Sequence, residues 1–135
     1  QLAHADEVIA RRRAIWARYR AGFAELAASG VFELPRIPAA DRVANGHIFY
    51  LLIDTLPTRL ALAAHLKARD MLSVSHYVPL HSSPGGKKFG RAHGSFSVTD
   101  DISDRLLRLP IYFGIADAEV DAVIDAVKGF FSQRR

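Results

Sequence analysis

Apolar residues near the start of the chain recur at steps of three and four residues. This spacing predicts one amphipathic helix from Leu2 to Ser29, which Gly30 ends. Such a helix would be about 40 Å long, whereas a compact chain of this length has a radius of gyration of about 14 Å. We therefore expect one end to project, and because the chain begins at Gln1 inside this pattern we expect it to be part of a longer protein. The apolar positions are Val8, Ile9, Ile15, Trp16, Tyr19, Phe23 and Leu26.

The middle of the chain alternates between strand and helix patterns. The segment "VFELPRIP" (31–38) predicts a brief strand, because its two prolines stop regular pairing. The continuous apolar run "HIFYLLI" (47–53) predicts a central strand that is covered on both faces. Residues 56–70 have helical spacing, with Pro57 in a first turn that tolerates proline. The run "MLSVSHY" (71–77) predicts a second strand.

The last part of the chain predicts a loop and two helices. Prolines and glycines break regular structure through Gly94, and Thr99 is expected to begin a helix that ends at Pro110. A final helix is expected to begin near Asp117. All these elements predict a single domain over residues 1–135, of layered α+β class, with helices packed on a small sheet. The buried face of the final helix is expected to contain Val120, Val123, Ile124, Val127, Phe130 and Phe131.

Composition limits the location and the class of the protein. The 135 residues are 50% hydrophobic and 24% charged, which is typical of a folded globular domain. The chain has no cysteine, so disulfides and thiolate metal sites are excluded. No apolar run approaches the roughly 20 residues that span a bilayer. We expect a cytoplasmic protein that does not bind a membrane.

The stretch "SHYVPLHSSPGGKKFGRAHG" (75–94) is the strongest candidate for a binding site. It holds three of the six histidines of the chain together with a tyrosine, two lysines and an arginine. This is more polar chemistry than a connecting turn needs, and it follows a predicted strand, where binding residues commonly lie.

Several reaction classes are poorly supported by this stretch. His76 and His81 are five residues apart with Pro79 between them, and no acidic residue is interleaved, so a metal site is not expected. There is no G-x-S-x-G elbow for a serine nucleophile, and "SSPGGKKFG" lacks the spacing of a phosphate-binding P-loop. The net charge of +4 leaves open an alternative, in which the runs 11–20 and 85–91 make a free-standing basic module that binds nucleic acid or phosphorylated ligands.

Four stretches carry a resemblance to a known family: "RRRAIWARYRAGF", "NGHIFYLLI", "HYVPLHSSPGGKKFGRAHG" and "SDRLLRLPIYFGI". They resemble the sugar-nucleotide aminotransferases of the DegT/DnrJ/EryC1/StrS type, and among these the dTDP-4-oxo-6-deoxy-D-glucose transaminases. The resemblance implies the aspartate-aminotransferase fold and a homodimer that binds pyridoxal phosphate. It also implies that an amino group moves from glutamate to a keto sugar carried by a nucleotide.

The resemblance covers only the small C-terminal domain of such an enzyme. It implies that residues 1–30 form a helix that runs between two domains, and that the large cofactor-binding domain lies outside this chain. None of Lys67, Lys87, Lys88 and Lys128 has the context of the lysine that forms the Schiff base. The resemblance therefore implies that the chain holds no catalytic residue, binds no pyridoxal phosphate and is inactive alone.

The same resemblance assigns substrate contacts to the stretch 75–94. His76 and Tyr77 are expected to offer hydrogen bonds to the sugar, and His81 to steady the loop or reach the ligand. Cationic side chains could meet the diphosphate or order the loop through charge-assisted hydrogen bonds; they are Lys87, Lys88 and Arg91. Near the domain junction, the family's "NAH" sequence is matched by Asn45 and His47, with Gly46 between them where alanine is common.

Overall fold

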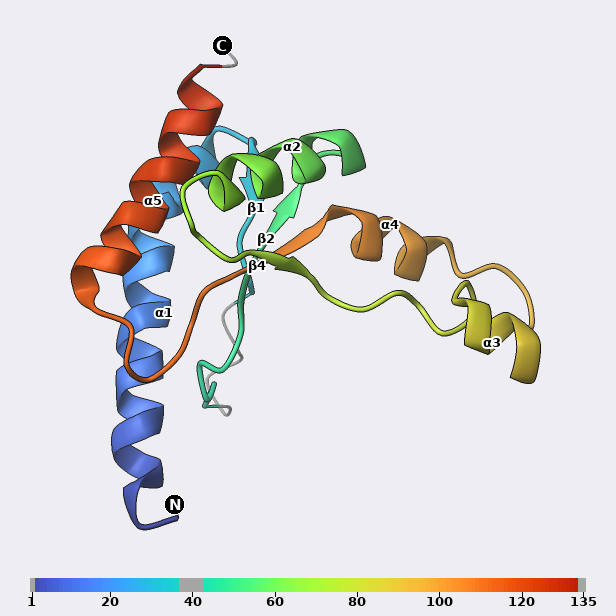
Figure 1. Ribbon diagram of the computed structural model, residues 1–135, viewed down its shortest axis with the longest axis horizontal. Helices are drawn as coiled ribbons and strands as arrows, with labels where there is room; N and C mark the ends of the chain where they lie inside the picture. Colours follow the sequence, from blue (N-terminus) through green and yellow to red (C-terminus); the bar gives the residue numbers. More distant parts are fainter. Residues whose placement is uncertain (1, 37–42, 134–135) are drawn as a thin grey trace.

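Helices pack on a four-stranded antiparallel sheet in the computed structural model, which describes residues 2–36 and 43–133 (Figure 1). The strand order in the sheet is β1-β2-β4-β3. This arrangement confirms the predicted α+β class with helices on a small sheet. The elements are η1 (Leu2–His4), α1 (Ala5–Ala28), β1 (Phe32–Glu33), β2 (Phe49–Ile53), α2 (Leu56–Lys67), β3 (Val74–Ser75), α3 (Pro84–Phe89), α4 (Ser97–Arg105), β4 (Leu106–Leu109) and α5 (Asp117–Ser132).

The first helix has the predicted extent and end. Gly30 has a φ of 79°, in the left-handed region that glycine adopts most easily. Its N–H donates to Ala27 O, and the N–H of Val31 donates to Leu26 O, so two carbonyls at the end of α1 are satisfied. The buried residues of α1 begin only at Ile15, and the N-terminal turns project beyond the rest of the fold (Figure 1).

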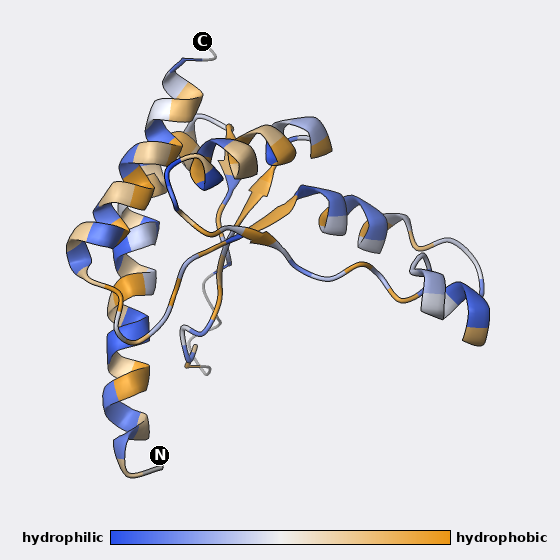
Figure 2. Cartoon of the chain, in the orientation of Figure 1, coloured by the Kyte–Doolittle hydropathy of each residue, from blue (hydrophilic) through white to orange (hydrophobic). Residues whose placement is uncertain are grey.

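The strand β2 lies inside the sheet and in the core, as predicted. Phe49, Leu51 and Ile53 are fully buried, and Leu52 on the opposite face is nearly so. Around Phe49 the rings of Trp16, Tyr19 and Phe23 pack at centroid distances of 5.0 to 6.2 Å. Figure 2 shows the apolar colour concentrated on this strand and on the inner sides of the helices. The apolar run therefore builds the contact between sheet and helices.

The predicted helix from Thr99 to Pro110 is wrong in its second half. The helix α4 ends at Arg105, and β4 follows it directly and pairs with both β2 and β3. Leu107 and Leu109 are buried at the alternating spacing of a strand. Leucines favour helices, but pairing between two strands satisfies both edges of this backbone and buries the leucines. Thr99 is also not the cap, since Phe96 occupies that position.

The region between β3 and α4 also differs from its prediction. The predicted strand 71–77 is reduced to Val74–Ser75, and the predicted loop contains the short helix α3. The Ser83 hydroxyl begins this helix by accepting from the N–H of Gly86 at 2.9 Å. A Cβ on Gly86 would lie 1.5 Å from Leu80 O, so glycine is required by a close backbone contact. Gly86, which belongs to the glycines that predict a loop, therefore permits a tight helical turn.

The helices α1 and α5 are joined by charge as well as by packing. All six residues predicted for the buried face of α5 are buried. At the rim of this interface Arg11 pairs with Asp117 at 2.6 Å, and Arg18 pairs with Asp121 at 2.6 Å. The hydrogen bond from Arg18 holds the pKa of Asp121 below its usual value. Within the described residues, no helix is long and apolar enough to cross a membrane.

The buried phenol of Tyr19 gives the fold a testable dependence on alkaline pH. Its hydroxyl donates to Pro110 O at 2.8 Å, and burial, with a smaller contribution from the charge of Tyr112, raises the pKa of Tyr19 above its ordinary value. The phenol must stay protonated in the fold, so its contribution is complete below about pH 10 and is lost as the pH rises further. We expect Tyr19→Phe to lower the free energy of unfolding at pH 7 by about 1 kcal/mol and to flatten the loss of stability above about pH 10. Urea titrations at both pH values measure this, with exposed Tyr77→Phe as the control, and an equally steep alkaline loss in Tyr19→Phe contradicts it.

Two glycines should respond to alanine with opposite signs. Gly30→Ala places a side chain at a positive φ, and we expect it to lower the free energy of unfolding by about 1 kcal/mol. Gly129 lies within α5 and its added Cβ would meet nothing within 4 Å, so Gly129→Ala should raise stability by about 0.5 to 1 kcal/mol. Gly114→Ala, at an open position outside the helices, is the matched control. Thermal and urea unfolding measure all three, and equal losses for the Gly30 and Gly114 variants would refute the helix-end argument.

Candidate functional site

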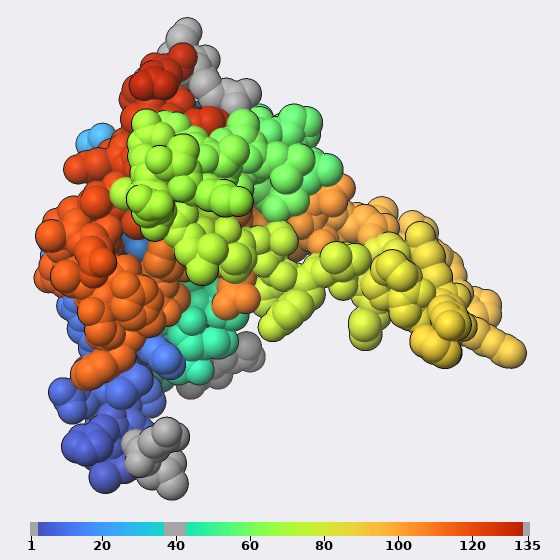
Figure 3. Space-filling model, in the orientation of Figure 1, coloured from blue at the N-terminus to red at the C-terminus, as the bar shows by residue number. Residues whose placement is uncertain are grey.

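Residues 76–105 leave the sheet as an arm that contains α3 and α4 (Figure 1). In the space-filling view the arm extends away from the helices and sheet that form the body of the molecule (Figure 3). The candidate stretch 75–94 lies almost entirely on this arm, so the structure gathers its polar residues on a projecting element.

An inner groove of about 440 Å³ runs along the arm near its base. His76 and Tyr77 line one side of it, and α4 forms the other. The two rings pack edge to face at 4.9 Å, and the carbonyl of Tyr77 accepts from the Ser103 hydroxyl at 3.2 Å. The Tyr77 side chain is 75% exposed, so its hydroxyl is available to a ligand. The apolar members of the lining are Val78, Pro79, Leu80, Val98, Ile102 and Leu106.

An outer groove of about 610 Å³ adjoins the inner one, and Leu80 and Thr99 line both. His81 lies in its wall, where its ring stacks on Phe96 at 4.4 Å and its Nε2 shares a hydrogen bond with Asp100 at 2.8 Å. These contacts tie the chain before α3 to the start of α4. Of the two predicted roles for His81, its contacts in the chain support the steadying of the loop.

Three cations surround the tip of the arm. Lys87 and Arg91 line the outer groove, whereas Lys88 lines neither groove and places its Nζ 5.0 Å from the ring centroid of Phe89. Within residues 2–36 and 43–133, no ion pair involves any of these three side chains. Exposed cations that no carboxylate neutralises create a positive potential that attracts an anionic ligand.

Asn45 and His47 line neither groove on the arm. They lie before β2, where Asn45 Oδ1 accepts from the N–H of His47 and also contacts its ring. Gly46 between them has a φ of 66°, and a Cβ there would lie 3.0 Å from the α1 backbone at Arg12 and Arg13. Glycine suits this turn sterically, and the place of Asn45 and His47 at a domain junction stays a prediction.

Three of the five arginines in the basic run 11–20 bind partners within the chain. Arg11 and Arg18 are paired with carboxylates of α5, and Arg20 donates to Pro35 O at 2.8 Å. The hydrogen bond that Arg18 donates to Asp121 also raises the pKa of Arg18 above its ordinary value. These arginines stabilise the contacts of α1, which weakens the alternative that residues 11–20 bind nucleic acid.

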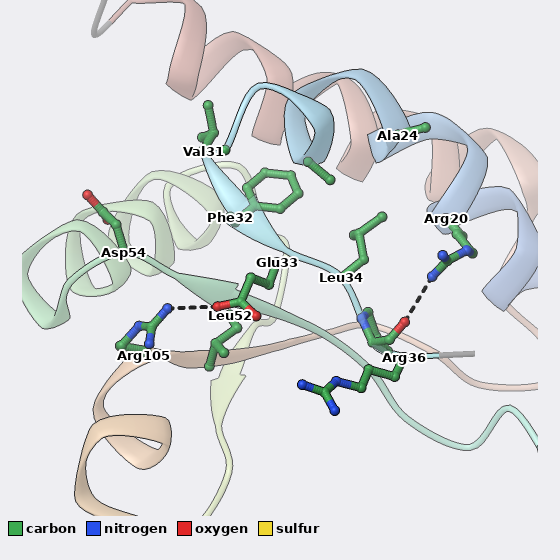
Figure 4. A pocket seen from close by; sticks show the side chains of 13 residues that line it. Arg20, Ala24, Val31, Phe32, Glu33, Leu34, Arg36, Leu52, Asp54 and Arg105 are labelled. Atoms are coloured by element: carbon green, nitrogen blue, oxygen red, sulfur yellow. Dashed lines mark hydrogen bonds and ion pairs between the residues drawn. The ribbon is translucent and has the colours of Figure 1, made fainter. Parts of the chain in front are cut away.

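A third cavity, of about 580 Å³, lies beside β1 and includes none of the predicted site residues (Figure 4). Its polar side chains come from α1, β1, α4 and two connecting segments, and Arg105 pairs there with Glu33 at 3.1 Å. No motif or spacing in the sequence connects these two residues, which are brought together only by the sheet. This cavity lies at the base of the arm, beside Arg105.

The four lysines of the chain lie at the surface or only half-buried. Lys67, Lys87 and Lys88 are exposed on helix surfaces, and Lys128 is only half-buried on α5. A lysine that forms a Schiff base needs a desolvated or charge-tuned environment, and none of the four is enclosed in one. Among residues 2–36 and 43–133, no group of three or more potential metal ligands occurs.

Comparison with known proteins identifies where this fold occurs. The model of the DegT/DnrJ/EryC1/StrS aminotransferase family matches residues 1–128. The chain is 32% identical over 130 residues to the dTDP-3-amino-3,4,6-trideoxy-alpha-D-glucose transaminase of Micromonospora megalomicea subsp. nigra, covering 95% of this chain and 34% of that protein. It therefore spans about a third of the length of this relative.

Two solved structures have the same fold over nearly the whole chain. The aminotransferase TlmJ from Streptoalloteichus hindustanus superposes with a TM-score of 0.87 at 24% identity, covering 100% of this chain and 35% of that one. Streptomyces venezuelae DesV, solved in complex with a ketimine intermediate, has a TM-score of 0.81 at 32% identity, with 96% and 33% covered. The helices on a four-stranded antiparallel sheet match the small C-terminal domain of the aminotransferase structures, which confirms the predicted fold.

The contacts of His81 predict that this side chain keeps the arm ordered. We expect His81→Ala to make amide exchange of residues 81–100 about five to ten times faster, because the stack on Phe96 and the bond to Asp100 are lost while β2 and α5 are unaffected. Hydrogen-exchange mass spectrometry of the two proteins measures this. His76→Ala, which removes an exposed ring packed only on Tyr77, is the control, and equal exchange in both variants would contradict the steadying role.

Proposed function

The chain belongs to the DegT/DnrJ/EryC1/StrS aminotransferase family, and we propose that it is the substrate-side domain of a sugar-nucleotide aminotransferase. In this proposal the arm binds the nucleotide sugar and closes the active site, while the amino transfer takes place on pyridoxal phosphate held elsewhere in the longer protein. The observation that carries the proposal is the pair of adjoining grooves, which bring the "HYVPLH" residues and the tip cations onto one element.

The chemistry of the two grooves suits the two ends of such a ligand. A sugar needs hydrogen-bonding groups beside an apolar surface, and the inner groove offers Tyr77 and His76 next to aliphatic side chains. A diphosphate needs cations without competing carboxylates, and the tip offers Lys87, Lys88 and Arg91. The arm would therefore orient the sugar and fix its distance from the reacting group.

The cofactor belongs in the part of the longer protein that this chain does not cover. Aminotransferases of this family use pyridoxal phosphate, which supplies the electron sink for amino transfer when it is bound. Because the lysines of this chain do not fit the cofactor, we propose that the chain contributes binding and closure. Glutamate as amino donor and a homodimer of the longer protein complete the proposal.

The proposed substrate is a dTDP-linked keto-deoxy sugar. The sequence resemblance favours a 4-keto-6-deoxy sugar, whereas the name of the Micromonospora relative places the amino group on carbon 3. Both substrates share the nucleotide and the diphosphate, which the tip cations would contact in the same way. An assay of the longer protein with 3-keto and 4-keto substrates distinguishes the two.

We expect His76→Ala and Tyr77→Phe in the longer protein to reduce kcat/KM for the keto sugar by about tenfold to a hundredfold each, which is the loss of one or two oriented hydrogen bonds. The half-reaction with glutamate should be unchanged in both, because it does not use the sugar contacts. Single-turnover spectroscopy separates the two half-reactions.

A matched control for these variants is Leu60→Ala, at an exposed position of α2 away from both grooves. Unchanged sugar kinetics in the His76 and Tyr77 variants would overturn the site assignment. Binding of a generic nucleic acid with a steep salt dependence, abolished by replacing the tip cations, would support the basic-module alternative instead.

A further inference from the structure

The arm is attached to the body by a short length of sheet. Between β3 and β4 only two residue pairs form the ladder, Val74↔Arg108 and Ser75↔Leu107. Beyond these pairs the arm continues through α3 and back through α4. Two residue pairs alone hold the orientation of so long an arm only weakly. Side-chain contacts at the base of the arm must therefore determine where its grooves lie relative to the body.

Arg105, at the junction of α4 and β4, makes three hydrogen bonds at this base. Its Nε donates to Ile53 O at 2.7 Å, its first terminal nitrogen to Asp101 at 2.8 Å and its second to Glu33 at 3.1 Å. One planar guanidinium thus joins β1, the end of β2 and α4, and the pair with Glu33 is visible in the cavity of Figure 4. The Arg105 side chain is 23% exposed, so water screens these bonds less than at an open surface.

A second arginine supports the same turn of the helix. Arg59 of α2 donates its Nε to Asp104 O at 2.6 Å, which satisfies a carbonyl at the end of α4. We call Arg105 with its three hydrogen bonds the clamp. The residues next to the clamp, Ser103 and Leu106, line the inner groove, and the Ser103 hydroxyl donates to the carbonyl of Tyr77. Arg105 and the residue that binds Tyr77, Ser103, therefore lie in the same last turn of α4.

We propose that Arg105 is a positioning residue that fixes the direction of the arm, and through it the place of the inner groove relative to the body. Its consequence for turnover rests on the proposed function, in which the groove presents the sugar. A ligand displaced by about 1 Å from its productive position can lose about a hundredfold in rate, so a clamp outside the grooves can control the reaction without touching the substrate.

The absence of cysteine from the chain allows a direct test of the geometry. His93→Cys on the arm and Asp125→Cys on α5 place two spin labels at exposed positions. We expect Arg105→Gln to shift or broaden the distribution of distances between the two labels, measured by pulsed electron paramagnetic resonance. Arg105→Lys should do so as well, because an ammonium cannot span the three acceptors in the same plane. Glu33→Gln, which removes the charge of one partner and keeps Arg105, should give a smaller change.

The control is Arg108→Gln, which removes a charge from β4 three residues away without touching the clamp. An unchanged distribution in Arg105→Gln and Arg105→Lys would overturn the proposal. Circular dichroism identifies any unfolded variant, and Glu33→Gln then supplies the decisive comparison, because an effect no larger than that of Arg108→Gln would also overturn it.

The kinetic test uses the longer aminotransferase. We expect Arg105→Gln to raise KM for the keto sugar or lower its kcat by about tenfold or more, while the glutamate half-reaction stays unchanged; a general loss of structure would impair both. Equal effects on both half-reactions would refute a positioning role in catalysis. If the unmodified longer protein aminates no keto sugar, the proposed function fails, while the label distances still decide whether Arg105 directs the arm.

Discussion

The pairing of β4 between β2 and β3 is the constraint on which the rest of the structure depends. It completes the sheet that α1, α2 and α5 cover, and it also brings the chain back from the arm at the point where the arm must be anchored. Leu107 and Leu109 pack into the core, while the residue directly before this strand, Arg105, is the clamp. The short strand β4 thus connects the body of the molecule to the arm, which is proposed to bind the nucleotide sugar.

The arginines of the chain show how a basic composition is divided between structure and ligand. Arg11 and Arg18 on α1 pair with carboxylates of α5, and Arg59 and Arg105 at the base of the arm donate to carbonyl oxygens and acids. At the tip of the arm, Lys87, Lys88 and Arg91 take part in no ion pair within residues 2–36 and 43–133. The net charge of +4 therefore says little about function, whereas the distribution of partners says where an anion would bind.

The body could be predicted from sequence because its apolar periodicities are strong and local. The end of α1 at Gly30, the central strand β2 and all six buried residues of α5 agree with the pattern. The strand β4 could not be predicted, because "LLRL" has no local feature that separates a strand from the last turn of a helix. Only pairing with residues more than fifty positions earlier in the chain decides it, and a periodicity argument contains no such information.

The polar residues of the arm single it out as a candidate site, whereas its secondary structure is predicted wrongly. Both have the same physical cause. Tyr77, Leu80, Phe89 and Val98 are each at least 75% exposed, so burial within this chain does not impose an apolar period on the segment. Without an apolar periodicity, the prolines and glycines are the main local indications of secondary structure, and they predict a loop where α3 forms. A segment that is not shaped by its own core is free to carry the histidines, tyrosine and cations that a ligand needs. Its position must then be fixed from outside, which is why the hydrogen-bonding junction at Arg105 is more informative about function than the cavity beside it.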